Sequence, residues 1–338
     1  MASTINDVAK LAGVSRQTVS RVLNEPGRVN PDTLQNVKRA IEKLDYHPNI
    51  TARNLANNVV KTVGLFMPFG VAEVRQNLFF STLSATVCHH FADKDFVLQL
   101  FTSLDEEDYG SLFKRLYREK RVGGLILTCP SVNNQQIVEL LAARIPFVLV
   151  GRPGVELEGA SYVDVDNAEA ADRLFSYLLE LGHQRIGFLN APPSLTLAVD
   201  LSEGIDRARK RWAERSELIE EHSGLTLEYG YEAAKRMLSA PDRPTAIMAA
   251  DDLLIMGVAK AAEELGLSIP GDLSIASAVK NGWGDLLPIP LTYIDTQFEK
   301  LGGISAAYII DQISGEPTQQ LRCVLPVQLV EGQSCRRL

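Results

Sequence analysis

The sequence predicts an N-terminal all-α helix-turn-helix head with a hinge helix, followed by a larger α/β domain of two lobes with doubly wound parallel sheets. Short amphipathic helical patterns separated by turn residues fill residues 1–47. From residue 61 onward, apolar strand-like runs alternate with helical patterns. A chain of 338 residues is also long for a single core, so two or three domains are expected.

The first helix is expected to run from residue 5 to about residue 12. Its apolar residues recur at helical spacing: Ile5, Val8, Ala9 and Ala12. Thr4 is the predicted N-cap, with Asp7 as the acid of a capping box. Gly13 supplies the left-handed residue that ends this helix, and Val14 buries the turn.

The second helix is expected to follow Ser15, its cap, and to reach about Asn24. Its apolar side consists of Val19, Val22 and Leu23. Its other side projects the polar residues Arg16, Gln17, Ser20 and Arg21. The two helices predict a helix-turn-helix that offers bidentate donors to a DNA major groove. The first-turn polar cluster, the turn glycine and the N-terminal position favour this interpretation over a surface helical hairpin with solvated charges.

A third helix is expected after Asn30, its cap, with Pro31 at its first position. Its buried stripe consists of Leu34, Val37, Ile41 and Leu44. Three such helices can close a small core, so residues 1–47 are predicted to form an independent head.

A hinge is predicted over residues 48–60. Residues 50–58 have helical propensity but are too few and too polar to form a stable helix alone. Ala52 and Ala56 lie on one face, so two copies can pack closely across a two-fold axis, and Leu55 stands beside them. The segment is either a flexible linker or a helix that folds on DNA and wedges Leu55 into a minor-groove base step.

Ten apolar strand-like runs are expected after residue 61: 62–68, 96–101, 124–129, 146–151, 162–165, 185–190, 245–250, 273–279, 291–295 and 323–330. Helical patterns lie at 112–119, 168–181, 229–238 and 253–265. Near-continuous apolar strands with helical crossovers predict parallel sheets. Two successive groups of strands suggest two lobes with a cleft between them, like periplasmic sugar-binding proteins.

The charge distribution separates the head from the rest of the chain. The net charge is −8, but residues 1–60 hold eight lysines and arginines against five acids, a net of +3 that leaves −11 for the remainder. This fits a phosphate-binding module joined to a domain that does not bind DNA. The four cysteines follow no metal or redox spacing, so neither a metal nor a cofactor is expected. With no signal peptide and no long apolar run, a cytoplasmic protein, associated with the nucleoid when bound to DNA, is expected.

The stretch DVAKLAGVSRQTVSRVLN, from Asp7 to Asn24, resembles the N-terminus of the LacI/GalR family of bacterial transcription regulators. Further stretches at 163–171, 178–192, 244–275 and 291–302 match the usual form of this family. The resemblance implies a sequence-specific DNA-binding regulator, a repressor, controlled allosterically by a small-molecule effector in the cleft between the lobes. It also favours the hinge helix, because family members carry a leucine at the position of Leu55 for that purpose.

The resemblance also implies the limits of the lobes. The first lobe would hold about 62–161 and 292–320, including a helix at about 302–314, and the second about 162–291 and 321–338, so that residues 61–338 form the effector-binding and dimerisation domain. The chain would cross between the lobes three times. Because no heptad helix follows the last strand, a homodimer on a palindromic operator is expected rather than a tetramer.

Arg16, Gln17 and Arg21 are expected to read base edges. The other candidate DNA-binding residues, which include phosphate contacts and hinge positions, are Thr4, Ser15, Thr18, Ser20, Asn24, Asn30, Thr33, Tyr46, Asn49, Ala52, Leu55 and Ala56. The candidate effector-binding residues are Phe79, Thr128, Arg152, Leu201, Asp251, Val279, Trp283 and Gln297.

The cleft departs from the family pattern where sugar-responsive members often hold an arginine and an aspartate. Leu201 and Val279 stand there, and neither makes charge-assisted bonds to adjacent hydroxyls. The asparagine common at the position of Asp251 is an acid here. A sugar derivative or related metabolite, rather than a plain hexose, is therefore expected. Asp251 and Trp283 favour a ligand with a cationic or apolar-faced portion, unless Asp251 only caps the next helix and Trp283 is buried in a loop.

The sequence argues against one other function and leaves two open. No GxSxG elbow, P-loop or GxGxxG follows a strand, and no carboxylate pair has the spacing of an acid/base couple, so an enzyme is not expected. A regulator gated by a protein co-regulator remains an alternative. So does a small-molecule-binding protein whose head serves only for dimerisation, which a salt-dependent affinity for DNA would exclude.

Overall fold

The computed structural model describes residues 3–24, 26–46, 59–103, 109–133, 135–212, 216–222 and 224–338. The chain divides into two compact units, Met1–Val59 and Val60–Leu338. Four of the predicted hinge residues, Asn49, Ala52, Leu55 and Ala56, lie outside the described residues.

The head consists of α1 (Ile5–Ala12), α2 (Arg16–Asn24), the short 3-10 helix η1 (Pro26–Arg28) and α3 (Pro31–Lys43). The predicted caps are confirmed. Thr4 and Asp7 form a reciprocal capping box, and Gly13 has a φ of 68° at the end of α1. The Ser15 hydroxyl accepts the N–H of Thr18 at 3.1 Å, and the Asn30 side chain accepts the N–H of Asp32 at 2.9 Å.

The core of the head lies where the apolar stripes of its three helices meet. Its buried residues are Val8, Ala9, Val19, Val22, Val37 and Ala40. The Ser3 hydroxyl donates to the carbonyl oxygen of Leu44 at 2.7 Å, which ties the N-terminal segment to the end of α3. The polar side of α2 is thereby left facing away from the core.

The larger unit contains two six-stranded sheets. The sheet of the first lobe is parallel throughout, in the order β11 (Arg322–Leu325), β5 (Tyr162–Val165), β4 (Phe147–Val150), β3 (Gly124–Thr128), β1 (Thr62–Met67), β2 (Val97–Thr102). The sheet of the second lobe has the order β12 (Gln328–Val330), β10 (Thr292–Asp295), β9 (Ser274–Ser277), β8 (Ala246–Ala249), β6 (Arg185–Asn190), β7 (Glu217–His222), and only β12 is antiparallel to its neighbour.

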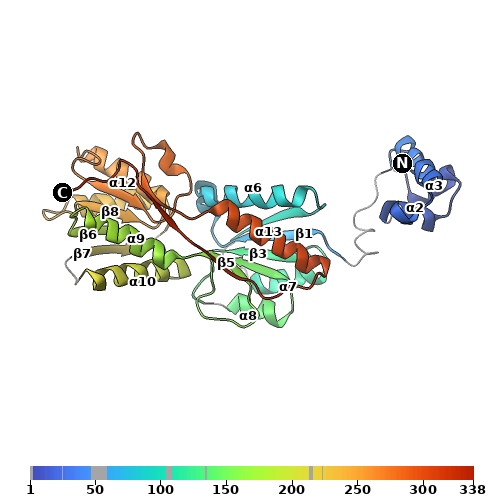
Figure 1. Cartoon of the computed structure of the whole chain (residues 1–338), viewed down its shortest axis with the longest axis horizontal. Helices are drawn as coiled ribbons and strands as arrows, with labels where there is room; N and C mark the ends of the chain where they lie inside the picture. Colours follow the sequence, from blue (N-terminus) through green and yellow to red (C-terminus); the bar gives the residue numbers. More distant parts are fainter. Residues whose placement is uncertain are drawn as a thin grey trace. The chain divides into compact units, whose positions relative to one another are not determined.

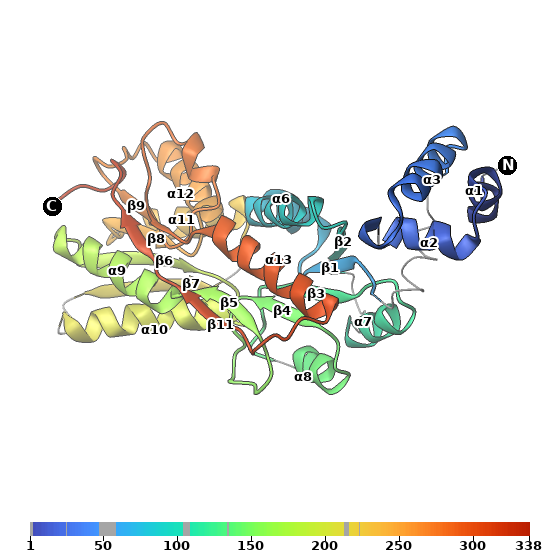
Figure 2. The same ribbon diagram turned by 45° about the vertical axis from the view of Figure 1, so that its right-hand side comes forward.

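Helices cover both faces of each sheet, as the apolar strands require. In the first lobe, α6 and α13 lie on one face and α7 and α8 on the other (Figure 1). The helices of this lobe are α5 (Val71–Gln76), α6 (Leu78–Ala92), α7 (Tyr109–Arg118), α8 (Gln135–Ala142) and α13 (Phe298–Ser314). In the second lobe, α9 packs on α10 and α11 on α12, on opposite faces of the sheet (Figure 2). The elements of this lobe are α9 (Asn167–Glu180), α10 (Thr196–Arg211), α11 (Leu227–Leu238), α12 (Asp252–Glu264) and the 3-10 helix η2 (Trp283–Leu286).

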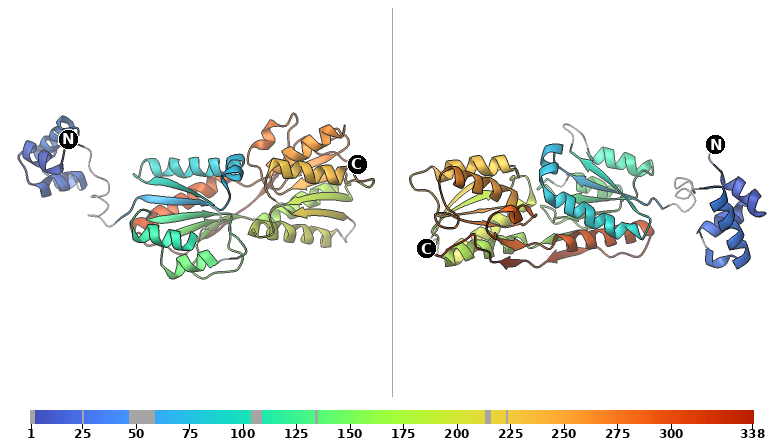
Figure 3. Two further views of the ribbon diagram at one scale, coloured as in Figure 1. Left: turned by 180° about the vertical axis from the view of Figure 1, so that it is seen from behind. Right: turned by 90° about the horizontal axis from the view of Figure 1, so that it is seen from above.

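The chain passes between the lobes three times, after β5, after β10 and between β11 and β12 (Figure 3). The predicted lobe boundaries are wrong at each passage. β5 and β11 belong to the first sheet although they were assigned to the second lobe, and β10 belongs to the second sheet although it was assigned to the first. The reason is that strand pairing, which is not local in sequence, decides membership of a sheet.

Three further elements differ from the prediction. The expected strand 323–330 is two strands, since Pro326 interrupts it and lacks the N–H that a ladder needs. The helix expected at about 302–314 begins earlier, at Phe298. Sequence reasoning missed the edge strand β7, whose sequence ELIEEH has only two apolar residues, Leu218 and Ile219, and so gives neither an apolar run nor an alternating pattern. Among the described residues, no helix is long and apolar enough to cross a membrane.

Candidate functional site

The exposed side of α2 carries the residues predicted to read DNA. Arg16, Gln17 and Arg21 are exposed, whereas Val19 and Val22 on the opposite side are buried. The arrangement presents two guanidinium groups and an amide from one rigid helix, which are the groups that bind guanine and adenine edges in a major groove. Ser15 and Thr18 lie at the helix N-terminus with their hydroxyls 2.9 Å apart.

The other predicted head residues have local structural roles that the structure makes visible. Thr4 and Asn30 cap α1 and α3, so their oxygens already accept backbone N–H groups. Thr33, on α3, and Tyr46, after it, are half-buried against the head. Ser20 is half-buried on α2, and Asn24 is the last residue of that helix.

A cavity lies between the two lobes, at the carboxyl ends of strands from both sheets. It encloses about 740 Å³ including its open mouth. Its lining residues are Asn77, Phe79, Cys129, Pro130, Val150, Gly151, Asp164, Val165, Asn167, Leu195, Thr196, Leu197, Leu225, Ala250, Asp251, Val279, Asn281, Phe298 and Leu301. Such a crevice at strand carboxyl ends is the usual place for a ligand in doubly wound folds.

The cavity includes three of the eight predicted effector residues: Phe79, Asp251 and Val279. Thr128 points elsewhere, because its buried hydroxyl donates to the carbonyl oxygen of Phe66 at 2.8 Å. The prediction for Leu201 is wrong: this residue has no exposed surface and packs in the core on the inner side of α10.

The remaining three predicted residues lie outside the cavity lining. The Trp283 indole N–H donates to the carbonyl oxygen of Gln76 at 2.7 Å, which joins η2 of the second lobe to α5 of the first. The Gln297 amide donates to the carbonyl oxygen of Pro326. Arg152 follows β4 and binds Asp200.

Two carboxyl groups, one from each lobe, line the cavity. Asp164 is 5% exposed, and its oxygens accept the backbone N–H groups of Arg152 and Val165 at 2.9 and 2.8 Å. Burial raises the pKa of Asp164 to about 7. Asp251 is 2% exposed, accepts the N–H of Leu254 at 3.0 Å as the cap of α12, and has a pKa raised to about 7, again by burial.

Sequence reasoning missed several polar and aromatic members of this site. Asp164 sits inside a strand, where alternation marks it only as one position of a buried β-run. Asn167 begins α9, directly after Asp166, which caps that helix by accepting the N–H of Glu169. Phe298 also lines the cavity, where its ring lies 5.0 Å from that of Phe79 in an edge-to-face pair. A signal was available in Asp166 and Asn167, the polar residues that directly follow β5.

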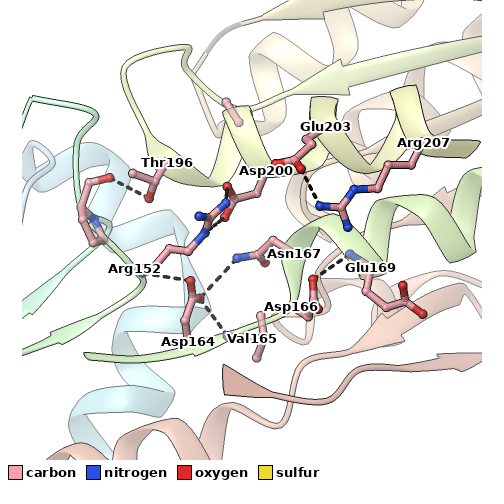
Figure 4. A network of polar contacts seen from close by, with 12 residues as sticks. Arg152, Asp164, Val165, Asp166, Asn167, Glu169, Thr196, Asp200, Glu203 and Arg207 are labelled. Carbon is pink, nitrogen blue, oxygen red and sulfur yellow. Dashed lines mark hydrogen bonds and ion pairs between the residues drawn. The ribbon is translucent and has the colours of Figure 1, made fainter. Parts of the chain in front are cut away.

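A set of polar contacts fastens the lobes together beside the cavity. Arg152, from the loop after β4 of the first lobe, forms a two-pronged ion pair with Asp200 on α10 of the second, with Nε to Oδ2 at 2.8 Å (Figure 4). The Asp200 side chain is 3% exposed and that of Arg152 is 42% exposed. Burial raises the pKa of Asp200, and Arg152 acts against this by stabilising the carboxylate.

The same side of the cavity has a short antiparallel contact between the lobes. Ser131 and Leu195 form an isolated bridge, and the N–H of Val132 donates to the carbonyl oxygen of Ser194 at 2.8 Å. Together with the Trp283–Gln76 hydrogen bond, these contacts stabilise the arrangement in which the cavity is bounded by both lobes.

The fold and the site define a class: a two-lobed binding domain of the periplasmic-binding-protein kind, in a chain that also carries a helix-turn-helix head. Two family models agree. Residues 4–49 match bacterial regulatory proteins of the lacI family, and residues 175–335 match the periplasmic binding protein-like domain.

Whole-chain relatives extend this match. The HTH-type transcriptional regulator AglR of Rhizobium meliloti (strain 1021) is 30% identical over 95% of this chain and 92% of its own, and the regulator CelR of Thermobifida fusca is 29% identical over 98% of each chain. The structure of a CelR–cellobiose complex has a TM-score of 0.72 at 28% identity, covering 98% of this chain and 99% of that one. The operator-bound lac repressor dimer shares the fold with a TM-score of 0.84 at 24% identity, covering 99% and 100%.

The chain belongs to the LacI family. It is a DNA-binding transcriptional regulator controlled by a small-molecule effector, and it is not an enzyme. The predicted family, fold class and general function are thereby confirmed.

Arg152→Met should loosen the lobes, because it removes the only charge paired with a buried Asp200 among the described residues. We expect a loss of about 1–3 kcal/mol of stability and a wider average separation of the lobes. Fluorescent labels at Lys120→Cys and Lys210→Cys, in a Cys88→Ser background because Cys88 is exposed, report that separation by energy transfer.

Arg207→Met is the matched control, since Arg207 pairs with Glu203 within α10 and joins no second lobe. Its energy transfer should equal that of the parent protein. Equal transfer in the Arg152 variant as well would mean that the ion pair does not hold the lobes.

Asp251→Asn should make the protein more stable at high pH relative to the parent chain. A folded-state pKa of about 7 lies above the ordinary 3.8, so the folded chain holds the proton more tightly and the parent loses stability as pH rises from about 4 to about 7. Asparagine still caps α12 but carries no titrating proton, so it removes this loss of stability. The stability of the variant relative to the parent should therefore rise by up to about 3 kcal/mol from pH 5 to pH 8. Calorimetry at both pH values measures this gain, and the exposed Asp285→Asn should show none.

Proposed function

We propose that the protein is a homodimeric repressor that reads a palindromic operator with α2 of each head. The observation that carries this proposal is the exposed row of Arg16, Gln17 and Arg21 on a helix whose other side is buried. One head covers one half-site, so two heads related by two-fold symmetry fit a palindrome. A lac repressor dimer bound to its operator is among the structural neighbours, and PurR repressors are among the relatives at 30% identity.

In this proposal residues 1–47 are the reading head, 48–60 the hinge and 61–338 the effector-binding and dimerisation domain. Arg16, Gln17 and Arg21 contact base edges. The phosphate contacts fall mainly to Ser15, Thr18, Ser20 and Asn24, with Thr4, Asn30, Thr33, Tyr46 and Asn49 at the borders of the head. Leu55, flanked by Ala52 and Ala56 of the two-fold partner helices, opens the central base step of the operator.

The effector is proposed to occupy the cavity between the lobes, where Phe79, Asp251 and Val279 contact it. The CelR relative has cellobiose bound in its solved structure, which supports a sugar derivative or related metabolite here. Ligand binding changes the relative rotation of the lobes and so the spacing of the two hinges. A regulator of this kind works in the cytoplasm, associated with the nucleoid when bound to DNA.

Arg16→Ala should weaken operator binding about 10- to 100-fold and relax the base preference at one position of each half-site, because a bidentate base contact is lost. Selection of binding sites from a random duplex library with the full-length protein identifies the operator, and repeating it with the variant reads the preference. Lys43→Ala removes the same charge from α3 and should leave the selected sequence unchanged, with at most a smaller salt dependence. A variant that selects the parent operator would contradict base reading by Arg16.

Leu55→Ala should leave the fold intact but lower operator affinity by about tenfold or more, since the wedge that offsets unstacking is gone. Circular-permutation gel shifts measure the DNA bend, and fluorescence anisotropy the affinity. An unchanged bend angle together with unchanged affinity would remove the wedge from the mechanism.

A further inference from the structure

We infer that the cavity between the lobes takes an effector without negative charge, one that presents hydrogen-bond donors (hydroxyl or ammonium groups) and an apolar face, and that it rejects phosphorylated metabolites. This rests on the proposed function of the cavity as the effector site. It adds a chemical class that separates sugars, nucleosides and amino compounds from their phosphate esters.

The ionisable side chains that carry charge at the cavity lining are both acids. Its two charged lining residues are Asp164 and Asp251, and no lysine, arginine or histidine lines it within the described part of the chain. The nearest guanidinium in the polar network, that of Arg152, turns to Asp200 and does not line the cavity. A phosphate placed there would be a buried anion facing acids with no cation to pair with it.

Two of the helix N-termini at the cavity are already occupied by the chain's own carboxylates. Helix N-termini attract phosphates through their free N–H groups, and α9 and α12 both begin here. Asp166 already caps α9, and Asp251 already caps α12. The adjacent Asp252 accepts the N–H groups of Gly282 and Gly284, both at 2.9 Å. At α9 and α12 the chain's own carboxylates therefore occupy the positions that a phosphate would use. α10 and α13 also begin at the cavity and have no side-chain cap, but no cation stands beside them among the described lining residues.

The cavity offers acceptors instead. The side-chain oxygen of Asn281, a lining residue, is buried with no hydrogen-bond partner in the described structure. The Asn281 amide nitrogen lies 3.4 Å from Asp251 Oδ2, a long contact that a ligand donor can replace. Phe79 and Phe298 supply the apolar wall beside these acceptors. A ligand with donors on one side and a flat apolar face on the other satisfies both surfaces.

The test is a thermal-shift screen of the full-length protein with matched compounds. The series are glucose, glucosamine and glucose 6-phosphate; ribose and ribose 5-phosphate; adenosine and adenosine 5′-monophosphate; and the uncharged disaccharides cellobiose and maltose. A ligand at a hundredfold its Kd raises the folded-to-unfolded ratio about a hundredfold, which the screen detects. We expect each compound that raises Tm to be uncharged or aminated, and its phosphate ester to have no effect.

Asp251→Asn then tests the role of the charge. This variant should bind the stabilising compound roughly tenfold or more weakly than the parent protein does. It should also show a smaller difference in affinity between that compound and its phosphate ester. Asp285→Asn removes an acid that is exposed and outside the cavity lining. It should therefore leave unchanged both the affinity for the compound and the difference in affinity from its phosphate ester. Asp164→Asn is the second variant, in case the first perturbs α12.

Three results would overturn the inference. The first is a phosphorylated compound that raises Tm as much as its unphosphorylated parent, and the second is that both aspartate variants still distinguish a compound from its phosphate ester as well as the wild-type protein does. The third is that no uncharged or aminated compound stabilises the protein. Operator binding, measured in the same preparations, separates these from failure of the proposed function. If DNA binding persists while a phosphate ester stabilises the protein, the regulator remains and only the charge selectivity falls.

Discussion

The three passages of the chain between its two sheets constrain everything else in the larger unit. Because β5, β10 and the β11–β12 pair leave one sheet and enter the other, the lobes cannot separate and can only rotate about these segments. The passages after β5 and β10 also fix the carboxyl ends of both sheets opposite one another, where polar loop residues converge. A binding cavity between the lobes is thus a consequence of the connectivity, and its opening and closing is the motion that the connectivity permits.

The contacts between the lobes beside this cavity are polar, so their contribution to the free energy of unfolding differs from that of a hydrophobic core. Asp200 is almost fully buried yet depends on a half-exposed arginine from the other lobe. Such a pair contributes little net stability, but breaking it leaves a carboxylate in a poor environment. The Trp283–Gln76 and Val132–Ser194 hydrogen bonds are similarly single and directional. A closed state held by few polar contacts is one that a ligand with modest differential affinity can shift.

A feature of the fold could be predicted from the sequence when the residues that determine it lie close together along the chain. The caps at Thr4, Gly13 and Asn30, and the apolar stripes of the head, are set within a few residues, so pattern reasoning found them. The sheet to which β5, β10 and β11 belong is decided by their pairing partners, which no local pattern reports. β5 and β11, for example, pair although they lie more than 100 residues apart in the sequence. The resemblance to a family supplied the lobes but misplaced their limits.

The candidate site shows the same division. Asp251 was identifiable because it stands where the family commonly has an asparagine, and the alternative that it caps α12 proved compatible with lining the cavity. Leu201 failed because one residue of helical rotation decides whether a position on α10 faces the core or the cleft. Asp164 was missed because a carboxylate inside a buried strand gives no periodic signal. Its meaning appears only when the second lobe brings α9 and α10 against it (Figure 4).

The separation of charge along the chain explains why the cavity can be acidic without weakening DNA binding. In the proposed function the phosphate contacts fall to residues 1–60, whose net charge is +3, while the rest of the chain carries −11 and includes both acids of the cavity. A single head with so few cations releases few counterions and binds DNA weakly at physiological salt. In the proposed dimer the second head binds as an intramolecular event, so affinity depends on how far apart the heads are held. Control of operator binding then requires only that the lobes alter this spacing. The effector need not approach the DNA, and its chemistry is free to be set by Asp164, Asp251 and the aromatic wall alone.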